Sequence, residues 1–361
     1  MKRLYLHDIH QKSGANFIQV EQYQIPLDYG NVIDELNAIN HSVGLLDRSY
    51  LGKIALSGSD ALDLLNRIST NDLKYLSVGT MCDTVFVTPK GRMIDYCRVI
   101  NTGDDLILIC SFYHAEHLID WINRFIILED VKVKNISQDY LWLTLIGPRS
   151  KIFLGTFCEK PIAEYDDVIW LDIDGNSFPA LKNSNFKAPA YNFCIRNKGI
   201  TNIIGFILHN LYSLNGRLIG DSAFQIIRVE SGMPDWGSEI TQDYNPHEAR
   251  LTHAISFTKE CYTGQEVISR IDTYEKIQKY LMIIELSKKI SCKPPLDIYI
   301  EDELIGHLTS YAFDPINNRS IGLGYIKKMY TREDNIYVEI IAQAERIPAK
   351  LRLPPQAYFH K

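Results

Sequence analysis

The residues whose chemistry is easiest to name lie in one polar segment, KECYTGQEVISR, at positions 259–270. A lysine two residues from a cysteine, as Lys259 is from Cys261, can lower the pKa of the thiol and favour the nucleophilic thiolate, whereas Glu260 opposes that effect. Gly264 permits a turn with positive φ and the close approach of a ligand. The residues alone therefore leave two interpretations open, a functional Cys261 thiol or a packed, inert one.

The end of the same segment has the charge pattern of a helix start. Glu266 places a carboxylate where it complements the helix dipole, and Arg270 follows at the i,i+4 spacing of a surface pair. The surrounding stretch 230–270 is long, polar and rich in Gly, Pro, Asn and Asp, which is typical of a structured functional loop. These residues either shape a ligand-binding loop or form a solvated helix surface.

The elements that must position this loop are predicted by hydrophobic spacing. Residues 51–137 form one α+β pattern, consisting of a strand at 53–56, a helix near 59–68, a hairpin around 89–91, a strand at 105–110 and a helix at 113–127. Elsewhere the spacing predicts a helix over 30–47 that stops at Gly44, strands within 131–146, a strand-rich stretch over 155–220 and a helix from Asp221 to Gly232.

The pattern becomes fully β after about residue 275. Five or so short strands with Gly and Pro between them predict a small closed or nearly closed antiparallel barrel, joined by a linker near 271–277.

Composition excludes several classes of protein. The 361 residues are 46% hydrophobic and 23% charged, as in soluble globular proteins of two or three domains. A net charge of −6 argues against sequence-independent binding to nucleic acid, and no apolar run is long enough to cross a membrane. The basic pair at the N-terminus is followed by a stretch broken by His7, Asp8 and His10, so no signal peptide and a cytoplasmic location are expected.

The metal-binding residue types are scattered. Seven widely spaced cysteines without a CxxC pair argue against a disulfide framework and against a zinc site. His114 and His117 have i,i+3 spacing, but no further ligand is near them in the sequence, so we expect a solvated helix face and no metal.

The polar segment resembles a known signature. KECYTGQEVISR is similar to K-G-C-Y-x-G-Q-E-x-x-x-R of the YgfZ family, which are folate-binding proteins related to the T-protein (aminomethyltransferase) of the glycine cleavage system. Glu260 stands where the signature has Gly. The resemblance extends over roughly residues 25–355, is weakest at 150–215, and includes the segments VGLLDRSYLGKIALSGSDALDLLNRISTNDL, CDTVFVTPKGRMID, RVESGMPDWGSEI, NPHEARL and IGHLTSY.

The resemblance implies an α+β fold of the T-protein and YgfZ type, in which three parts form a ring around a central folate pocket. The implied parts are a discontinuous folate-binding domain at 1–50 plus 138–272, a ferredoxin-like α+β domain at 51–137 and the C-terminal β-barrel at 275–361. We expect a monomer.

The resemblance also implies a site for tetrahydrofolate or a one-carbon derivative of it. The cofactor-binding residues expected from it are Thr84, Asp95, Tyr96, Arg228, Glu230 and Trp236. Cys261 would be the functional thiol and Lys259 would tune it, while the loop would be shaped by Tyr262, Gly264, Gln265, Glu266 and Arg270.

Two departures separate the chain from T-proteins. The T-protein hairpin ends in two aspartates, the second of which is catalytic, whereas this chain has Asp95 followed by Tyr96. A tyrosine, with a reference pKa of about 10, is a poor general base near neutral pH. The pterin-binding segment Gly-Tyr-Thr-Gly-Glu of T-proteins is also missing from residues 185–200. Both departures favour a YgfZ-type protein.

The main functional hypothesis is therefore a tetrahydrofolate-binding protein that supports the assembly or repair of iron–sulfur clusters in client enzymes through Cys261. A cluster needs about four ligands, so any cluster would be shared with client enzymes or assembly factors. The alternative is a folate-dependent one-carbon transferase, either an aminomethyltransferase or a demethylase, with Asp95 as its carboxylate. A third hypothesis is a folate-binding scaffold that does not depend on Cys261.

Overall fold

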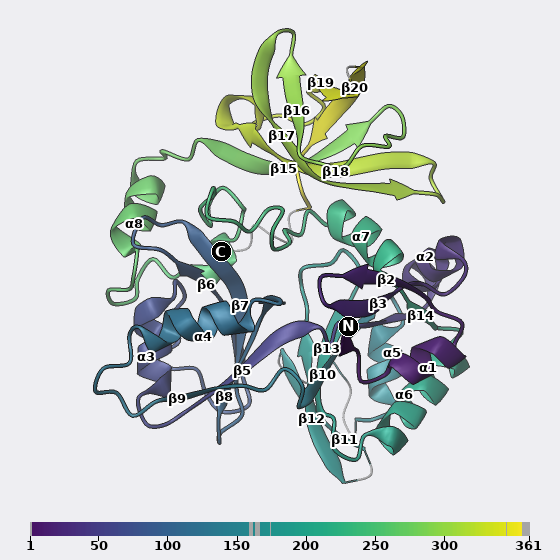
Figure 1. Ribbon diagram of the computed structural model, residues 1–361, viewed down its shortest axis with the longest axis vertical. Helices are drawn as coiled ribbons and strands as arrows, with labels where there is room; N and C mark the ends of the chain where they lie inside the picture. The colour runs from purple at the N-terminus through teal and green to yellow at the C-terminus, as the bar shows by residue number, and fades with distance from the viewer. Residues whose placement is uncertain (1, 159–161, 163–166, 174, 344, 356–361) are drawn as a thin grey trace.

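The computed structural model describes residues 2–158, 162, 167–173, 175–343 and 345–355. Four groups of strands organise them: a five-stranded sheet, a six-stranded sheet, a three-stranded sheet and a closed barrel. The barrel lies at one end of the molecule and the five- and six-stranded sheets lie side by side at the other (Figure 1). The mixture of helices and strands agrees with the α+β prediction.

The five-stranded sheet has the order β6-β7-β8-β5-β9, and all of its neighbouring strands are antiparallel. Leu64 and Leu65 of one helix and Leu118 and Ile122 of another are buried in its hydrophobic core. The elements are β5 (Leu51–Ser57), α3 (Ala61–Ile68), β6 (Met81–Val87), β7 (Met93–Asn101), β8 (Leu106–Phe112), α4 (Ala115–Asn123) and β9 (Lys132–Asn135).

The six-stranded sheet has the order β11-β12-β13-β10-β4-β14. Its members are β4 (Gly44–Asp47), β10 (Tyr140–Ile146), β11 (Val168–Ile173), β12 (Asn176–Lys182), β13 (Ala190–Arg196) and β14 (Arg217–Ile219), and it packs with α5 (Ser150–Gly155) and α6 (Thr201–Ser213). The helix predicted within 30–47, with a stop at Gly44, is present as α2 (Val32–His41), but it ends before Gly44 and residues 44–47 form strand β4. A Cβ at Gly44 would lie 2.9 Å from the Ile219 side chain, so glycine allows β4 to pair closely with β14.

The first three strands of the chain form a small sheet of order β1-β3-β2. Its elements and the neighbouring helices are β1 (Lys2–Arg3), α1 (His7–Lys12), β2 (Asn16–Val20), β3 (Tyr23–Asp28), α2 (Val32–His41) and α7 (Asp221–Glu230). The buried Glu35 carboxylate accepts hydrogen bonds from the N–H groups of Tyr29 and Gly220, so it ties α2 to the start of α7. Helix α7 in turn packs between β3 and two barrel strands.

The C-terminal strands form a closed antiparallel barrel of order β15-β18-β17-β16-β19-β20. This confirms the predicted barrel, which has six strands where five or so were expected. They are β15 (Lys279–Leu286), β16 (Leu296–Ile300), β17 (Glu303–Asp314), β18 (Arg319–Lys327), β19 (Tyr337–Ala342) and β20 (Glu345–Arg352), with short 3₁₀ turns at Thr252–Ala254 (η2) and Lys328–Tyr330 (η3). Helix α8 (Gln265–Thr273) occupies the first part of the expected linker at 271–277.

Each large sheet and the barrel draws its strands from one of the three segments expected as domains, although the exact domain boundaries stay a prediction. Within the described residues, no helix is both long enough and apolar enough to pass through a membrane. All seven cysteines are free thiols, and Cys261 is the exposed one.

One lysine is fully buried between the two large sheets. Lys53 on β5 has no exposed surface, and its Nζ donates to the carbonyl oxygens of Ser49 at 2.6 Å and Ser137 at 3.2 Å. Both acceptors are neutral, so burial dominates and lowers the pKa of Lys53 to about 8.

This burial predicts a pH-dependent stability. Between about pH 8 and the unfolded pKa of about 10.4, the unfolded chain binds more protons at Lys53 than the folded chain, so this group makes the free energy of unfolding rise with pH. We expect wild type to gain about 2 kcal/mol relative to Lys53→Met between about pH 8 and pH 10. Urea unfolding of both proteins measures this, with exposed Lys90→Met as the control. The prediction would be contradicted if the free energy of unfolding changed with pH in the same way in wild type and Lys53→Met.

Candidate functional site

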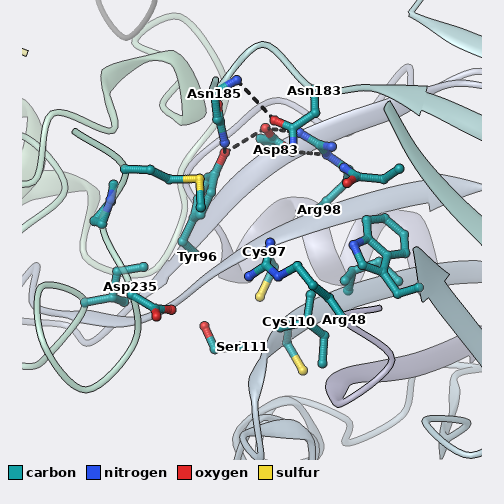
Figure 2. Close-up of a pocket in the computed structure, with 17 residues that line it drawn as sticks. Arg48, Asp83, Tyr96, Cys97, Arg98, Cys110, Ser111, Asn183, Asn185 and Asp235 are labelled. Carbon is teal, nitrogen blue, oxygen red and sulfur yellow. Dashed lines mark hydrogen bonds and ion pairs between the residues drawn. The ribbon is translucent and has the colours of Figure 1, made fainter. Parts of the chain in front are cut away.

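A polar pocket lies where the two large sheets meet the loop that follows α7 (Figure 2). Strands β6, β7 and β8 supply one side, β10 and the β12–β13 connection supply another, and residues 233–240 close the third. The cavity volume of the pocket is about 100 Å³, and all empty space in it, including the part that is open to solvent, is about 650 Å³. Its polar lining includes Arg48, Asp83, Tyr96, Arg98, Asn185 and Asp235.

The wall on the five-stranded sheet is built by a largely buried ion pair, in which the Arg98 side chain is 10% exposed and the Asp83 side chain is 15% exposed. Arg98 donates from Nε and from a terminal nitrogen to the two oxygens of Asp83, at 2.6 and 2.8 Å. Residues 83 and 98 are direct partners in the β6–β7 register, and Tyr96 lies on the same face of β7 as Arg98 because alternate residues of a strand share a face. The Tyr96 hydroxyl donates to the Asp83 carboxylate at 2.7 Å.

The charges of this network follow from burial and pairing. Burial alone would raise the pKa of Asp83, but the Arg98 guanidinium outweighs burial and holds that pKa below its usual range. Burial, followed by the nearby Asp83 charge, raises the pKa of Tyr96 well above its ordinary value. Near neutral pH, Asp83 is therefore a carboxylate and Tyr96 is a neutral phenol that can form hydrogen bonds but cannot act as a general base.

The Tyr96 hydroxyl also joins two other segments to the hairpin. The His253 Nε2 atom, from η2, lies 3.1 Å from it, and the Asn185 side chain donates to it at 3.4 Å. Figure 2 shows Asp83, Tyr96, Arg98 and Asn185 gathered on one side of the pocket.

Asp95 lies on the opposite face of β7 and does not line the pocket. Its carboxylate is fully buried and accepts hydrogen bonds from the Ser111 hydroxyl at 2.5 Å, the Ser111 N–H at 3.1 Å and the Tyr96 N–H at 2.8 Å. The His114 Nδ1 atom lies 3.0 Å from the same carboxylate. These contacts occupy the oxygen atoms of the Asp95 carboxylate and give it a structural role.

The expectation of a solvated face for His114 is wrong, because it is buried beside Asp95, whereas His117 is exposed.

The remaining residues expected to bind the cofactor hold the walls in place. The Thr84 hydroxyl is buried and accepts from the Asn71 N–H at 2.9 Å. The half-buried Trp236 ring packs against the His114 ring with their centroids 5.0 Å apart. Neither residue lines the pocket.

Arg228 and Glu230 connect α7 to different partners. The buried Arg228 guanidinium donates to the Met233 carbonyl at 2.8 Å, to Glu239 at 3.1 Å and to the Ser310 hydroxyl of β17 at 2.7 Å. Glu230 forms an ion pair with Arg319 of β18. Arg228 therefore fixes the loop that closes the pocket against the barrel.

In the motif loop, Lys259 is turned inward. Its Nζ donates to the carbonyl oxygens of Asn66 at 2.6 Å, Ser69 at 3.0 Å and Asn71 at 2.6 Å, which uses all three protons of the ammonium group. Burial lowers the pKa of Lys259 to about 8. The lysine anchors the loop to the end of α3, and its expected tuning of the exposed Cys261 thiol stays a prediction.

The rest of the motif packs against the β6–β7 hairpin. Tyr262 is buried, with the Lys259 ammonium 5.1 Å from its ring centre, and Gln265 donates to the Lys259 carbonyl at 3.4 Å. Gly264 has φ +81°, and a Cβ there would lie 2.6 Å from the Thr88 carbonyl of the hairpin. Glu266 and Arg270 form an exposed i,i+4 pair at 2.7 Å, the surface alternative.

Arg48 could hold a ligand. Its guanidinium lies over the Phe224 ring, 4.5 Å from the centroid, and it lines the pocket. Its Nε is buried and has no hydrogen-bond partner among the residues that the structure describes. A buried donor of this kind costs free energy unless a ligand or water accepts from it.

Sequence reasoning missed Arg48, Asp83, Arg98 and Asp235. A signal existed for two of them, because Asp83 and Arg98 are opposite charges on the two arms of the predicted hairpin, seven and eight residues from its central Lys90. Arg48 and Asp235 had no such signal, because their neighbours in the pocket are far away in the chain.

The buried pair predicts a stability change. Replacing Asp83 by Asn leaves Arg98 buried without its counter-charge, so we expect Asp83→Asn to lower the free energy of unfolding at about pH 7 by about 3 kcal/mol. Because the folded pKa of Asp83 is depressed, its contribution is present above the unfolded pKa of about 3.9 and decreases as the pH falls below that value. Urea unfolding at several pH values measures both effects. Exposed Asp120→Asn is the control, and an equal loss in both variants would refute the assignment.

Comparison with known proteins identifies two family domains. Residues 6–259 match the family described as the GCVT N-terminal domain, and residues 279–357 match the glycine cleavage T-protein C-terminal barrel domain.

Related proteins cover most of the chain. "Putative transferase At1g60990, chloroplastic" of Arabidopsis thaliana is 28% identical over 89% of this chain and 74% of its own length. The aminomethyltransferase of Bacillus cytotoxicus is 26% identical over 97% of this chain and 96% of its own, and that of Thermotoga maritima is 24% identical over 94% and 93%.

A solved structure shows the same fold. The glycine cleavage system aminomethyltransferase T of Bartonella henselae superposes with a TM-score of 0.85 at 18% identity, over 99% of this chain and 98% of that one. This confirms the predicted T-protein-type fold with its C-terminal barrel, while membership of the YgfZ branch stays a prediction. With its N-terminal domain and barrel both matched in order, the chain belongs to the glycine cleavage T-protein family.

Proposed function

We propose that the protein is a tetrahydrofolate-dependent one-carbon transferase that binds its cofactor in the pocket between the two large sheets. Tetrahydrofolate is the cofactor that membership of this family implies. The observation that carries the proposal is the convergence of Arg48, the Asp83–Arg98 pair, the Tyr96 hydroxyl and Asn185 on one hollow that Met233 and Ile240 line with apolar surface. Such a mixture suits a flat heterocycle with a polar edge.

The residues present fit the cofactor. The pterin edge carries both hydrogen-bond donors and acceptors, which match the Asn185 amide and the Tyr96 hydroxyl. The Nε donor of Arg48, which has no partner among the described residues, suits a carbonyl or carboxylate oxygen of folate. When bound, tetrahydrofolate supplies the nitrogen atoms that accept a one-carbon unit.

The acid–base group in this pocket differs from the one expected. Asp95 is turned away, and Asp83 is held in its ion pair, so the accessible carboxylate is Asp235, whose side chain is 40% exposed. The backbone N–H of Trp236 donates to the Asp235 carboxylate at 3.0 Å, and the Arg228 Nε atom lies 4.0 Å from it, so both orient the carboxylate. We assign to Asp235 the role of holding or accepting a proton beside the bound donor, and to Tyr96 that of a neutral hydrogen-bonding partner.

Calorimetric titration with tetrahydrofolate tests the cofactor site. We expect Arg48→Gln to weaken binding by about tenfold, because a charge-assisted hydrogen bond is worth about 1.5–3 kcal/mol. Exposed Arg124→Gln is the matched control and should bind as wild type does. Unchanged affinity in Arg48→Gln would place the cofactor elsewhere.

Turnover of methylated or aminomethylated donors with tetrahydrofolate tests the transferase itself. Asp235→Asn should retain folate affinity but lower kcat by about 10²-fold or more, the usual contribution of a general acid or base. The same kcat in wild type and Asp235→Asn would exclude the assigned role, and wild type without any turnover would argue for the second candidate.

The second candidate is a folate-binding protein of YgfZ type that supports iron–sulfur enzymes. It is favoured by the exposed Cys261 thiol in a motif loop that is otherwise anchored, and by the removal of Asp95 from the pocket. Within the described part of the chain, no group of three or more His, Cys, Asp or Glu side chains could hold a metal ion. A cluster would therefore be cargo shared with client enzymes or assembly factors as partners.

A deletion strain separates these functions. If the thiol acts on iron–sulfur clients, Cys261→Ala should fold and bind tetrahydrofolate as wild type does but fail to restore client activity. Cys292→Ala, at a partly buried barrel thiol, is the control and should complement. Full complementation by Cys261→Ala would leave only the transferase and the folate-binding scaffold.

A further inference from the structure

A second hollow lies between the two large sheets, outside the proposed folate pocket. Its floor is the face of β5 and β9 that carries Ala55, Ser57, Lys132 and Lys134, and its wall is Tyr140 together with the turn from β13 to α6. Its volume is about 790 Å³. In Figure 1 the five-stranded sheet, to which β5 and β9 belong, lies beside the six-stranded sheet. We call this hollow the basic cleft, after Lys132, Lys134, Arg196 and Lys198, which all line it.

The cations of the basic cleft are not neutralised by local pairing. Among the residues that the structure describes, no carboxylate lies within 4 Å of any of the four, whereas Arg67, Lys74 and Lys182 elsewhere on the surface each have such a partner. Asp105 and Asp139 also line the cleft, so its net charge is about +2 in a chain whose net charge is −6. The basic cleft is therefore a local concentration of positive charge in a protein whose net charge is negative.

The strand pattern explains how the floor becomes basic. In the sequence Lys132-Val133-Lys134 of β9, alternate residues point to opposite faces, so Val133 packs on the hydrophobic core with α4 while both lysines are exposed. Lysines on an edge strand such as β9 also discourage pairing with other chains. That role accounts for the two lysines but not for the cations on the facing wall.

The wall presents a fixed guanidinium. Arg196 is the direct partner of Tyr140 in the β10–β13 register, its Nε donates to the Tyr140 hydroxyl at 2.6 Å, and its guanidinium lies 5.5 Å from the ring centre. Its orientation is therefore set before any ligand arrives. Lys198 and Gly199 follow immediately, and they lead into the 13-residue helix α6, whose positive dipole end lies at the same edge of the cleft.

We propose that the basic cleft binds a small molecule that carries two or more phosphate groups. Guanidinium and ammonium groups on two facing walls match separate phosphates of one ligand, and a planar guanidinium favours bidentate phosphate contacts. The volume suits a small molecule. A long nucleic acid would meet the negative charge of the remaining surface, whereas a short oligophosphate meets only the cleft.

Calorimetry with inorganic tripolyphosphate at about 50 mM salt tests the site on the full chain. We expect one site per chain, at least tenfold weaker binding in both Lys132→Gln/Lys134→Gln and Arg196→Gln/Lys198→Gln, and affinity that falls with added salt. The control Lys90→Gln/Lys293→Gln removes the same charge from exposed lysines elsewhere and should bind as wild type does.

Three results would overturn the proposal. They are the lack of tripolyphosphate binding to wild type, equal weakening in the control variant, and tighter binding of hexaglutamate than of tripolyphosphate, which would indicate an acidic peptide instead. Tetrahydrofolate affinity should be the same in all of these variants, so the outcome is independent of the proposed folate site.

Discussion

The buried ion pair between Asp83 and Arg98 is the interaction on which the pocket depends. Two charges on facing strands of an apolar hairpin are costly to bury unless each satisfies the other, and their bidentate contact does so. Once that pair is in place, the Tyr96 hydroxyl has a fixed acceptor, and it brings His253 and Asn185 from two other segments to the same point. The arrangement of this pocket wall therefore depends on the register between β6 and β7.

Two further buried cations position the long segment between α7 and α8. Arg228 holds its beginning against the barrel, and Lys259 holds its end against the last turn of α3. Lys259 uses all three of its ammonium protons and Arg228 makes four hydrogen bonds, so each holds neighbouring layers together. The motif that contains Cys261 therefore stabilises the hairpin that carries Tyr96, while the Cys261 thiol itself is exposed.

The chemistry of the pocket depends on Tyr96, the residue of β7 whose side chain faces it. With Tyr96 facing the pocket and Asp95 facing α4, the hairpin offers a neutral hydroxyl where a carboxylate would otherwise stand. In the proposed transferase, negative charge beside a bound donor comes from Asp235 on the closing loop. The proposed folate pocket and the basic cleft both lie between the same two sheets, so one interface between layers provides two places of different polarity.

The sequence by itself determined the barrel, the α+β layer at 51–137, the hairpin at 89–91 and the relation to T-proteins, because these depend on local periodicity, turn residues and short-range spacing. It also indicated the positive-φ turn at Gly264, whereas the close approach of Gly264 to the Thr88 carbonyl came from the structure. It did not determine that Gly44 begins a strand, that His114 is buried or that Lys259 is turned inward, because each depends on residues far away in the chain. Only the tertiary structure decided which face of β7 lines the pocket, since a strand has two faces and the packing of the neighbouring layers selects one of them.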